Sequence, residues 1–253
     1  MRYDSFVALS LNISRNKALE LIEKKEVLLN QKSFKPSFNV KNYLQSLLGD
    51  ENLEEKDLLN SKALKLELLT KIYVSRGALK LKNFILQSAL DIKNKTCLDI
   101  GSSTGGFVEV LLEFKAAKVV ALDVGSNQLH QSLRENQRVK VFENTDLKDF
   151  KSDEKFEVIT CDVSFTSLLN LLFYIDKFAL KDIILLFKPE FEAGKNAKRT
   201  KKGVLKDEER LLEVRKEFEK ACLDLGWELK NTAVSSIKGK EGNVEYFYHY
   251  TKA

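Results

Sequence analysis

The sequence predicts an α/β protein, with a doubly wound sheet in its larger part and a small α/β domain at its N-terminus. Three observations support this fold class. After residue 74, short apolar runs rich in Val and Ile alternate with amphipathic stretches, a pattern typical of buried parallel strands connected by helices. A loop of small residues directly follows the first of these runs. The length of 253 residues suits one large and one small domain.

The larger part, residues 75–253, is expected to hold seven strands and four main helices. Parallel strands are expected at 96–100, 118–124, 139–143, 157–161 and 182–187, and an antiparallel pair at 227–234 and 246–251. Helices are expected at 106–114, 127–135, 166–177 and 207–225. Because strands and helices alternate along the chain, crossover connections and a doubly wound sheet are favoured.

The small N-terminal domain is expected at residues 1–60. Ser14 is a plausible helix N-cap, and residues 15–24 place apolar side chains on one helical face, before a short strand and turn at 27–30. Basic side chains surround this module, which favours RNA binding, with a solvated helix face as the alternative. The candidates for RNA contacts here are Arg15, Lys17, Lys24 and Lys25. The charge-rich residues 61–74 are interpreted as a linker.

Composition argues against several functional classes. The net charge of +5 fits a nucleic-acid partner but does not require one. Three widely spaced cysteines and two histidines form neither a disulfide framework nor a zinc pattern, so no metal is expected. The N-terminus lacks the apolar core of a signal peptide, and no apolar run approaches the ~20 residues that span a bilayer. We therefore expect a cytoplasmic protein without a membrane partner, and a monomer is the favoured oligomeric state.

The most informative segment is the loop after the strand at 96–100, Gly-Ser-Ser-Thr-Gly-Gly-Phe. Small residues there let the backbone approach a ligand at the carboxyl end of a sheet. The dinucleotide fingerprint is broken because Ser103 occupies its second glycine position, and a P-loop would continue from Gly106 into Lys rather than Phe107. Asp99, before the first glycine, suits a ligand with a positive amino-acid end, such as S-adenosylmethionine.

Two further acids support a nucleoside-containing cofactor. Asp123 ends the next expected strand, at the separation from the loop where an acid accepts hydrogen bonds from a ribose diol. Asp146 follows the third expected strand and is a candidate contact for the adenine edge. For any lone acid, surface solvation is the alternative. The candidate cofactor-binding residues are Asp99, Gly101, Ser102, Ser103, Thr104, Gly105, Gly106, Phe107, Asp123 and Asp146.

The ends of the fourth and fifth expected strands carry candidate catalytic groups. Asp162 lies in Cys-Asp-Val-Ser-Phe, where the absence of prolines weakens a base-nitrogen methyltransferase and Cys161 is a poor nucleophile for cytosine-C5 chemistry. Lys188 lies at the mouth of an apolar strand, where it could accept or guide the proton of a ribose hydroxyl. The alternative for Lys188 is a snorkelling lysine on the sheet rim.

Lys80 and Glu245 complete the candidate catalytic network. Lys80 shares a helical face with Arg76, four residues earlier, and Glu245 begins the last expected strand. Each can also be read as a surface charge. Together with Asp162 and Lys188, they would form a charge-balanced network of two lysines and two carboxylates around one pocket.

A basic stretch at residues 188–206 is a further candidate for RNA contacts. It includes Lys195, Lys198 and Arg199, and we expect a mobile loop that binds RNA phosphates. A disordered, solvated loop is the alternative. Arg76 is also a candidate for RNA binding.

Taken in order, these motifs resemble those of the TlyA proteins, which are rRNA 2′-O-methyltransferases related to the FtsJ/RrmJ ribose methyltransferases and historically labelled haemolysins. The resemblance is carried by S-R-G-A-L-K-L, D-I-G-S-S-T-G-G-F, C-D-V-S-F, K-P-E-F-E-A-G and G-N-V-E-Y-F. The N-terminal S-R-N-K-A-L-E-L-I is similar to the S4 RNA-binding domain of that family. The resemblance covers essentially the whole chain.

The resemblance implies a Rossmann-like class I methyltransferase sheet behind an S4-type domain, with S-adenosylmethionine as cofactor. It also implies a Lys-Asp-Lys-Glu catalytic tetrad, which maps onto Lys80, Asp162, Lys188 and Glu245, with Glu241 as the alternative to Glu245. Residues 71–74 fall where the family has a short linker that influences cofactor binding.

The implied substrate is a cytidine ribose in 23S rRNA, within ribosomal RNA or a ribosomal subunit. Longer members of the family also modify 16S rRNA, and this chain resembles the shorter type. Two rival functions stay open at this point: a non-catalytic S4-type rRNA-binding or ribosome assembly factor, and a pore-forming haemolysin.

Overall fold

The protein forms two compact units, one comprising Met1–Ile72 and the other beginning at Tyr73. The computed structural model describes residues 1–194, 196–239 and 241–252. The first unit extends beyond residue 60, where the sequence analysis ended it, because β2 (Leu66–Leu68) pairs antiparallel with β1 (Val27–Leu29). Most of the expected linker at 61–74 therefore belongs to the first unit.

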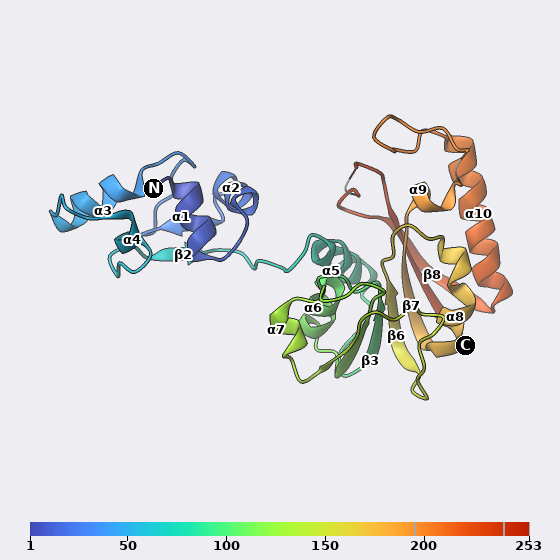
Figure 1. Ribbon diagram of the computed structural model, residues 1–253. Helices are drawn as coiled ribbons and strands as arrows, with labels where there is room; N and C mark the ends of the chain where they lie inside the picture. The colour runs from blue at the N-terminus through green and yellow to red at the C-terminus, as the bar shows by residue number, and fades with distance from the viewer. Residues whose placement is uncertain (195, 240, 253) are drawn as a thin grey trace. The chain divides into compact units, whose positions relative to one another are not determined.

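The first unit packs helices around this two-stranded sheet (Figure 1). Its helices are α1 (Tyr3–Ser10), α2 (Arg15–Glu23), α3 (Val40–Leu48) and α4 (Glu55–Leu58). Ser14 caps α2 as the sequence predicts, because its Oγ accepts a hydrogen bond from the backbone N–H of Lys17 at 3.2 Å. Fully buried side chains such as Tyr3, Leu29 and Leu44 form a core of its own for this unit.

The second unit contains a seven-stranded sheet in the order β5-β4-β3-β6-β7-β9-β8, within the part of the chain that the structure describes. The first five strands are parallel, whereas β9 lies antiparallel between β7 and β8. The bounds are β3 (Thr96–Ile100), β4 (Lys118–Leu122), β5 (Val139–Phe142), β6 (Phe156–Cys161), β7 (Ala179–Phe187), β8 (Trp227–Val234) and β9 (Tyr246–Lys252). The predicted doubly wound sheet with a final antiparallel pair is confirmed.

Helices cover both faces of this sheet (Figure 1). One apolar cluster joins the sheet to α5 (Gly77–Ser88), α6 (Gly106–Glu113) and α7 (Gln131–Arg134). Another joins it to the short 3-10 helix η1 (Leu168–Asn170), to α8 (Leu172–Phe178) and to α10 (Glu208–Asp224). A short helix, α9 (Pro189–Glu192), follows β7.

Two expected helices are shorter than predicted. The helix expected at 127–135 is reduced to α7, because Glu143 accepts the backbone N–H groups of Asn127, Gln128 and Leu129 and so holds them in a loop. The helix expected at 166–177 is divided into η1 and α8. Glu192 accepts a hydrogen bond from the backbone N–H of Leu168, the first residue of η1. In both places a carboxylate that is distant in the sequence accepts backbone N–H groups at the start of the expected helix.

The strand order reverses at the boundary between β3 and β6. The chain runs outward from β3 through β4 to β5, and then returns to begin β6 on the other side of β3. The connections that leave the carboxyl ends of β3 and β6 therefore diverge, and such switch points are where open α/β sheets bind ligands.

Candidate active site

Two adjoining cavities lie at the switch point. The larger, about 940 Å³, is called here the lysine cavity because Lys80 and Lys188 line it. The smaller, about 480 Å³, is called the aspartate cavity because Asp123 and Asp146 line it. The residues common to both walls are Gly101, Ser103, Asp162, Ser164 and Phe165. A ligand in one cavity would therefore be in direct reach of a ligand in the other.

The loop after β3 brings its backbone to the edge of both cavities. Gly101 has a φ of +79°, and a Cβ there would lie 2.5 Å from the backbone oxygen of Asp162. A Cβ on Gly106 would lie 2.1 Å from Ser75 Oγ and 2.9 Å from the backbone nitrogen of Ala78. Distances this short are impossible for real atoms, so the loop requires glycine at both positions, as its sequence suggests.

Asp123 is buried at the rim of the aspartate cavity. Its carboxylate accepts hydrogen bonds from the backbone N–H groups of Ser103 and Gly125, each at 2.7 Å. This fixes the carboxylate at the end of β4 while leaving it acceptor capacity for a diol. Asp146 is exposed on the same cavity wall and beside buried Leu147. A buried acid, an exposed acid and an apolar wall in a cavity of this size fit the ribose and base of an adenosine.

Asp99 occupies a different position from the one that the sequence suggests. It is 1% exposed and lines neither cavity, because its side chain points across the sheet and accepts a hydrogen bond from Thr160 Oγ1 at 2.6 Å. Burial raises the pKa of Asp99 to about 7. Gly105 likewise lines neither cavity, whereas Ser102, Thr104, Gly106 and Phe107 line the lysine cavity. The expected direct contact between Asp99 and the ligand is therefore replaced by a position beneath the loop.

The four residues of the proposed tetrad meet in the lysine cavity as two ion pairs. Lys80 Nζ, from α5, donates to Glu245 Oε2 at 2.6 Å, and both side chains are buried. Lys188 Nζ, which follows β7, lies 2.6 Å from Asp162 Oδ1, which follows β6. Glu245 makes the ion pair with Lys80, whereas Glu241, the alternative, lies exposed on the cavity wall.

Several residues at the site escaped the sequence analysis. Ser164 Oγ accepts a hydrogen bond from Lys188 Nζ at 3.1 Å. Phe165 is 92% exposed, has a φ of +65° and lies with its ring 5.4 Å from that of Phe191. Glu190 also lines the cavity, where burial raises its pKa. An aromatic residue three positions after the strand-end acid Asp162 is the signal that could have indicated Phe165.

The segment that connects the units is bound to the second unit next to the loop. The backbone N–H of Val74 donates to Glu109 Oε2 at 2.9 Å, and Tyr73 Oη donates to Glu113 Oε2 at 2.8 Å. Both acids lie on α6, the helix that begins at the end of the loop. These hydrogen bonds fix residues 73 and 74 against the helix that begins at the end of the loop.

The basic stretch at 188–206 is folded differently from the mobile loop that the sequence predicts. Residues 198–206 form a hairpin, called here the basic hairpin, in which Thr200 N–H donates to the oxygen of Val204 and Lys206 N–H to that of Lys198. Arg199 points inward and donates to the backbone oxygens of Glu190 and Gly194, so it supports the hairpin from within. Lys195 lies outside the described residues. The lysines exposed on the hairpin are Lys198, Lys201, Lys202 and Lys206.

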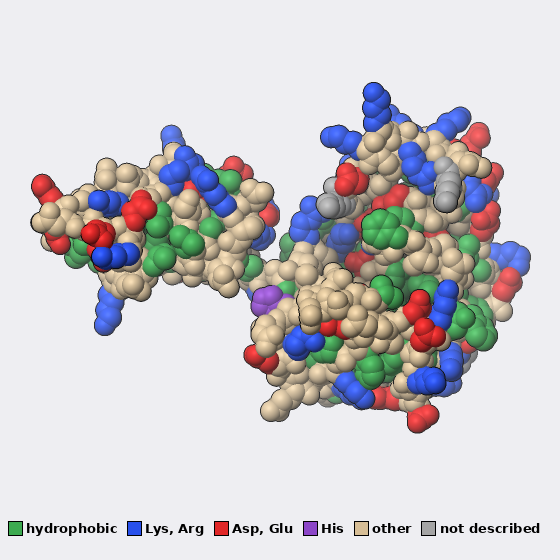
Figure 2. Space-filling model, in the orientation of Figure 1, with side chains coloured by type: hydrophobic (Ala, Val, Ile, Leu, Met, Phe, Trp, Pro, Cys, Tyr) green, Lys and Arg blue, Asp and Glu red, His purple; other side chains and the backbone are tan. Residues whose placement is uncertain are grey.

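Figure 2 shows Lys and Arg side chains projecting around the end of the second unit that carries this hairpin. Arg76 lines the lysine cavity and donates to the backbone oxygen of Lys238 at 3.2 Å. In the first unit, Arg15 pairs with buried Asp4, and Lys17 and Lys24 both pair with Glu20. The predicted RNA-binding residues of the first unit are at least partly exposed and lie on or directly after α2.

The strand order, the antiparallel β9 and the loop after β3 define a class I methyltransferase fold. Comparison with protein families agrees: the FtsJ-like methyltransferase family matches residues 73–252, and the S4 domain matches residues 1–42. The chain belongs to the FtsJ-like methyltransferases and, within them, to the TlyA family.

Individual relatives support this assignment. A Campylobacter jejuni protein described as 23S rRNA (cytidine-2′-O)-methyltransferase TlyA is 67% identical over 100% of both chains. A Mycobacterium tuberculosis protein described as a 16S/23S rRNA (cytidine-2′-O)-methyltransferase is 38% identical and covers 69% of this chain and 67% of its own. Among solved structures, a candidate hemolysin from Lactococcus lactis is 39% identical, with a TM-score of 0.66 over 72% of this chain and 89% of its own.

Two structural features bear on other classes of function. Within residues 1–194, 196–239 and 241–252, no group of His, Cys, Asp and Glu is placed to hold a metal ion. Among the helices in those same ranges, none combines the length and the apolar character needed to cross a membrane.

Proposed function

We propose that this protein transfers a methyl group from S-adenosylmethionine to the ribose 2′-hydroxyl of a cytidine in 23S rRNA. The observation that carries the proposal is the position of Lys188 in the lysine cavity. Lys188 is ion-paired with Asp162, which lines both cavities beside the loop at residues 101–107, called here the cofactor loop. The relative at 67% identity carries this activity in its description, which supports both the reaction and the 23S substrate.

The residues of the aspartate cavity fit the cofactor. Asp123 would accept hydrogen bonds from the ribose hydroxyls, Asp146 and Leu147 would adjoin the adenine, and the backbone of residues 101–104 would border the amino-acid end. When bound, S-adenosylmethionine supplies an electrophilic methyl group on a sulfonium sulfur. The protein therefore has to position the acceptor oxygen and to remove its proton.

The tetrad is arranged for both tasks. Lys188 would hold the 2′-hydroxyl and guide its proton, while Asp162 and Ser164 fix the direction of the Lys188 amine. Lys80 and Glu245 form a second ion pair that lines the same cavity. Because each lysine has a carboxylate partner, the buried charges are balanced before RNA binds, so the site need not rearrange to accept the ribose.

Presentation of the nucleotide is proposed to depend on Phe165. The target base must leave its helix so that its ribose reaches the cavity. The exposed ring of Phe165, beside Phe191, offers an apolar face at the mouth for stacking of an unpaired base. The S4-type unit and the lysines of the basic hairpin would hold the surrounding phosphates.

The test is a comparison of Lys188→Ala with Lys216→Ala, which removes an exposed lysine of α10. We expect Lys188→Ala to lower methyl transfer to 23S rRNA at least ~100-fold, as loss of a proton-guiding group does. Its affinity for S-adenosylmethionine by calorimetry should stay close to that of the unaltered protein, as should both properties of Lys216→Ala.

The methyl-transfer assay, together with a dye-release assay on lipid vesicles, separates the rival functions. A non-catalytic assembly factor would bind rRNA without incorporating methyl groups, and a haemolysin would release dye from lipid vesicles. Mapping of methylated riboses in 16S and 23S rRNA with the unaltered protein would identify the substrate. A Lys188→Ala protein that methylates rRNA at the native rate would refute the assigned role of Lys188.

A further inference from the structure

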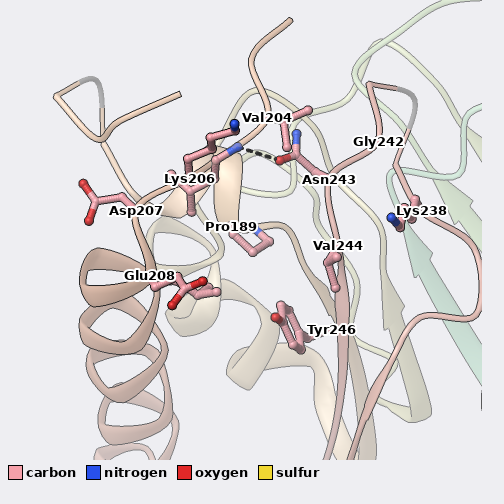
Figure 3. A pocket seen from close by; sticks show the side chains of 12 residues that line it. Pro189, Val204, Lys206, Asp207, Glu208, Lys238, Gly242, Asn243, Val244 and Tyr246 are labelled. Carbon is pink, nitrogen blue, oxygen red and sulfur yellow. Dashed lines mark hydrogen bonds between the residues drawn. The ribbon is translucent and has the colours of Figure 1, made fainter. Parts of the chain in front are cut away.

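Polar contacts attach the basic hairpin to other parts of the second unit that the structure describes. Asn243 makes two of them, since its Oδ1 accepts from the backbone N–H of Leu205 at 2.9 Å and its Nδ2 donates to the backbone oxygen of Gly203 at 3.5 Å. Figure 3 shows the first of these bonds as the dashed line between Asn243 and the chain beside Val204. Arg199 makes another attachment, to Glu190 and Gly194.

Asn243 also belongs to the turn that carries a member of the tetrad. It lies two residues before Glu245, and its backbone oxygen accepts a hydrogen bond from the backbone N–H of Gly239 at 2.9 Å. Only 4% of Asn243 is exposed, although it is polar. One side chain thus connects the turn before Glu245 with the chain segment that presents Lys201 and Lys202.

Asn243 forms part of the wall between two cavities. On one side lies the lysine cavity. On the other lies a cavity of about 490 Å³, called here the tyrosine cavity, with Pro189, Leu211 and Tyr246 in its walls (Figure 3). Val204 and Leu205 of the hairpin line the tyrosine cavity and are only half-buried, so their apolar packing is incomplete. The hydrogen bonds of Asn243 should therefore contribute much of the order of the hairpin, because a segment with few buried apolar contacts opens easily.

We propose that Asn243 is a positioning residue that fixes the basic hairpin to the catalytic turn, so that RNA phosphates bound by the hairpin lysines place the target ribose over Lys188. This inference rests on the proposed function and deepens it. A buried amide suits the role because it joins two backbone segments without adding a charge near the tetrad. It couples the part of the protein that holds RNA with the part that carries out the chemistry.

The first test is limited proteolysis with trypsin, which cleaves after exposed lysines. We expect Asn243→Ala to speed cleavage within 198–206 at least five-fold, with cleavage elsewhere unchanged. Asn243→Asp keeps the acceptor for the Leu205 N–H and should restore most of the protection. The control is Asn136→Ala, because Asn136 also accepts a backbone N–H, from Arg138 at 3.0 Å, but lies beside β5.

The second test is methyl transfer. For Asn243→Ala we expect the KM for rRNA to rise about ten-fold, kcat to fall a few-fold and the Kd for S-adenosylmethionine to stay unchanged, with Asn243→Asp intermediate. Unchanged cleavage and unchanged KM in Asn243→Ala would overturn the proposal. Equal losses in cofactor binding and RNA binding would also overturn it, because they indicate general damage to the fold. If the unaltered protein did not methylate rRNA, the proposed function would fail while the cleavage comparison still decided the anchoring role.

Discussion

Asp99 and Asp123 are buried acids at the ends of neighbouring strands, and their surroundings give them different roles. Asp123 receives two backbone N–H groups and faces the aspartate cavity, so a charged carboxylate is well supported there. Asp99 receives only the Thr160 hydroxyl, and its Oδ2 has no hydrogen-bond partner among the described residues. The sequence predicts a cofactor contact for both acids. The directions of their side chains in the structure distinguish Asp123, which faces the cavity, from Asp99, which does not.

The raised pKa of Asp99 predicts a pH dependence of stability. In the unfolded chain this carboxyl ionises near 3.8, whereas burial raises the folded pKa to about 7, with Asp162 and Asp123 adding to the rise. The folded state therefore binds the proton more tightly, and this group lowers the free energy of unfolding progressively as pH increases from about 4 to about 7. Above that range the full penalty remains.

Asp99→Asn removes this titration and keeps an acceptor for Thr160. Relative to the unaltered protein, the variant should gain stability at about pH 8 compared with about pH 5, as measured by urea unfolding at both values. The readout is the difference in the free energy of unfolding between the two proteins at each pH. Other carboxyls, such as those of Asp4 and Glu143 with their lowered pKa, titrate equally in both proteins and cancel in this difference. The same pH dependence in both proteins would show that Asp99 keeps its ordinary pKa.

At the level of elements, α5 and α6 begin in contact with each other. Gly106 opens α6 so close to the start of α5 that a Cβ would lie 2.9 Å from the backbone nitrogen of Ala78. Since α5 also carries Lys80, the packing of these two helix ends sets the distance between the cofactor loop and the Lys80–Glu245 pair.

Gly106→Ala should therefore separate the two helix ends. Overpacking of this kind costs about 1–3 kcal/mol, which urea unfolding would measure, and methyl transfer should fall because Lys80 moves with α5. The matched control is Gly77→Ala, at the start of α5, where a Cβ would come no nearer than 3.4 Å to its closest neighbour. We expect this control to unfold at nearly the native urea concentration, and an equally mild effect of Gly106→Ala would contradict the packing argument.

Much of the second unit could be predicted from the sequence because its strands are apolar runs with clear boundaries. The loop glycines could also be located, since they follow a strand end. The four residues of the proposed tetrad came from the family motifs, and the structure brings them to one cavity. The short helix α4 could not be predicted, because its sequence is largely polar and it forms through packing of Leu58 against the core of the first unit. For α3 the signals are present and were missed: an amphipathic sequence lies between the N-cap Asn39 and the C-cap Gly49. The inward direction of Arg199 depends on backbone oxygens of α9 and the turn after it, which no local pattern encodes.

At the scale of the whole molecule, we propose that the two compact units divide the work between RNA capture and chemistry. All four residues of the proposed tetrad belong to the second unit, and the first unit exposes basic side chains such as Lys24 and Lys25. Charge changes in the first unit should therefore alter the affinity for RNA without altering the chemical step.

The corresponding variant is the double substitution Lys24→Glu with Lys25→Glu. Lys24 pairs with Glu20 across one helical turn, and Lys220 pairs with Asp224 in the same way on α10, so Lys216→Glu with Lys220→Glu is a control of equal charge and similar ion-pair loss. Exposed pairs of this kind contribute only about 0–1 kcal/mol, so neither protein should unfold.

We expect the first variant, Lys24→Glu with Lys25→Glu, to raise the KM for rRNA about ten-fold at moderate salt. The dependence of its KM on salt concentration should be weaker, because fewer counterions are released from the RNA. Its kcat at saturating rRNA and its Kd for S-adenosylmethionine should equal those of the control. A fall in kcat with unchanged KM would instead mean that the S4-type unit contributes directly to the geometry of the chemical step.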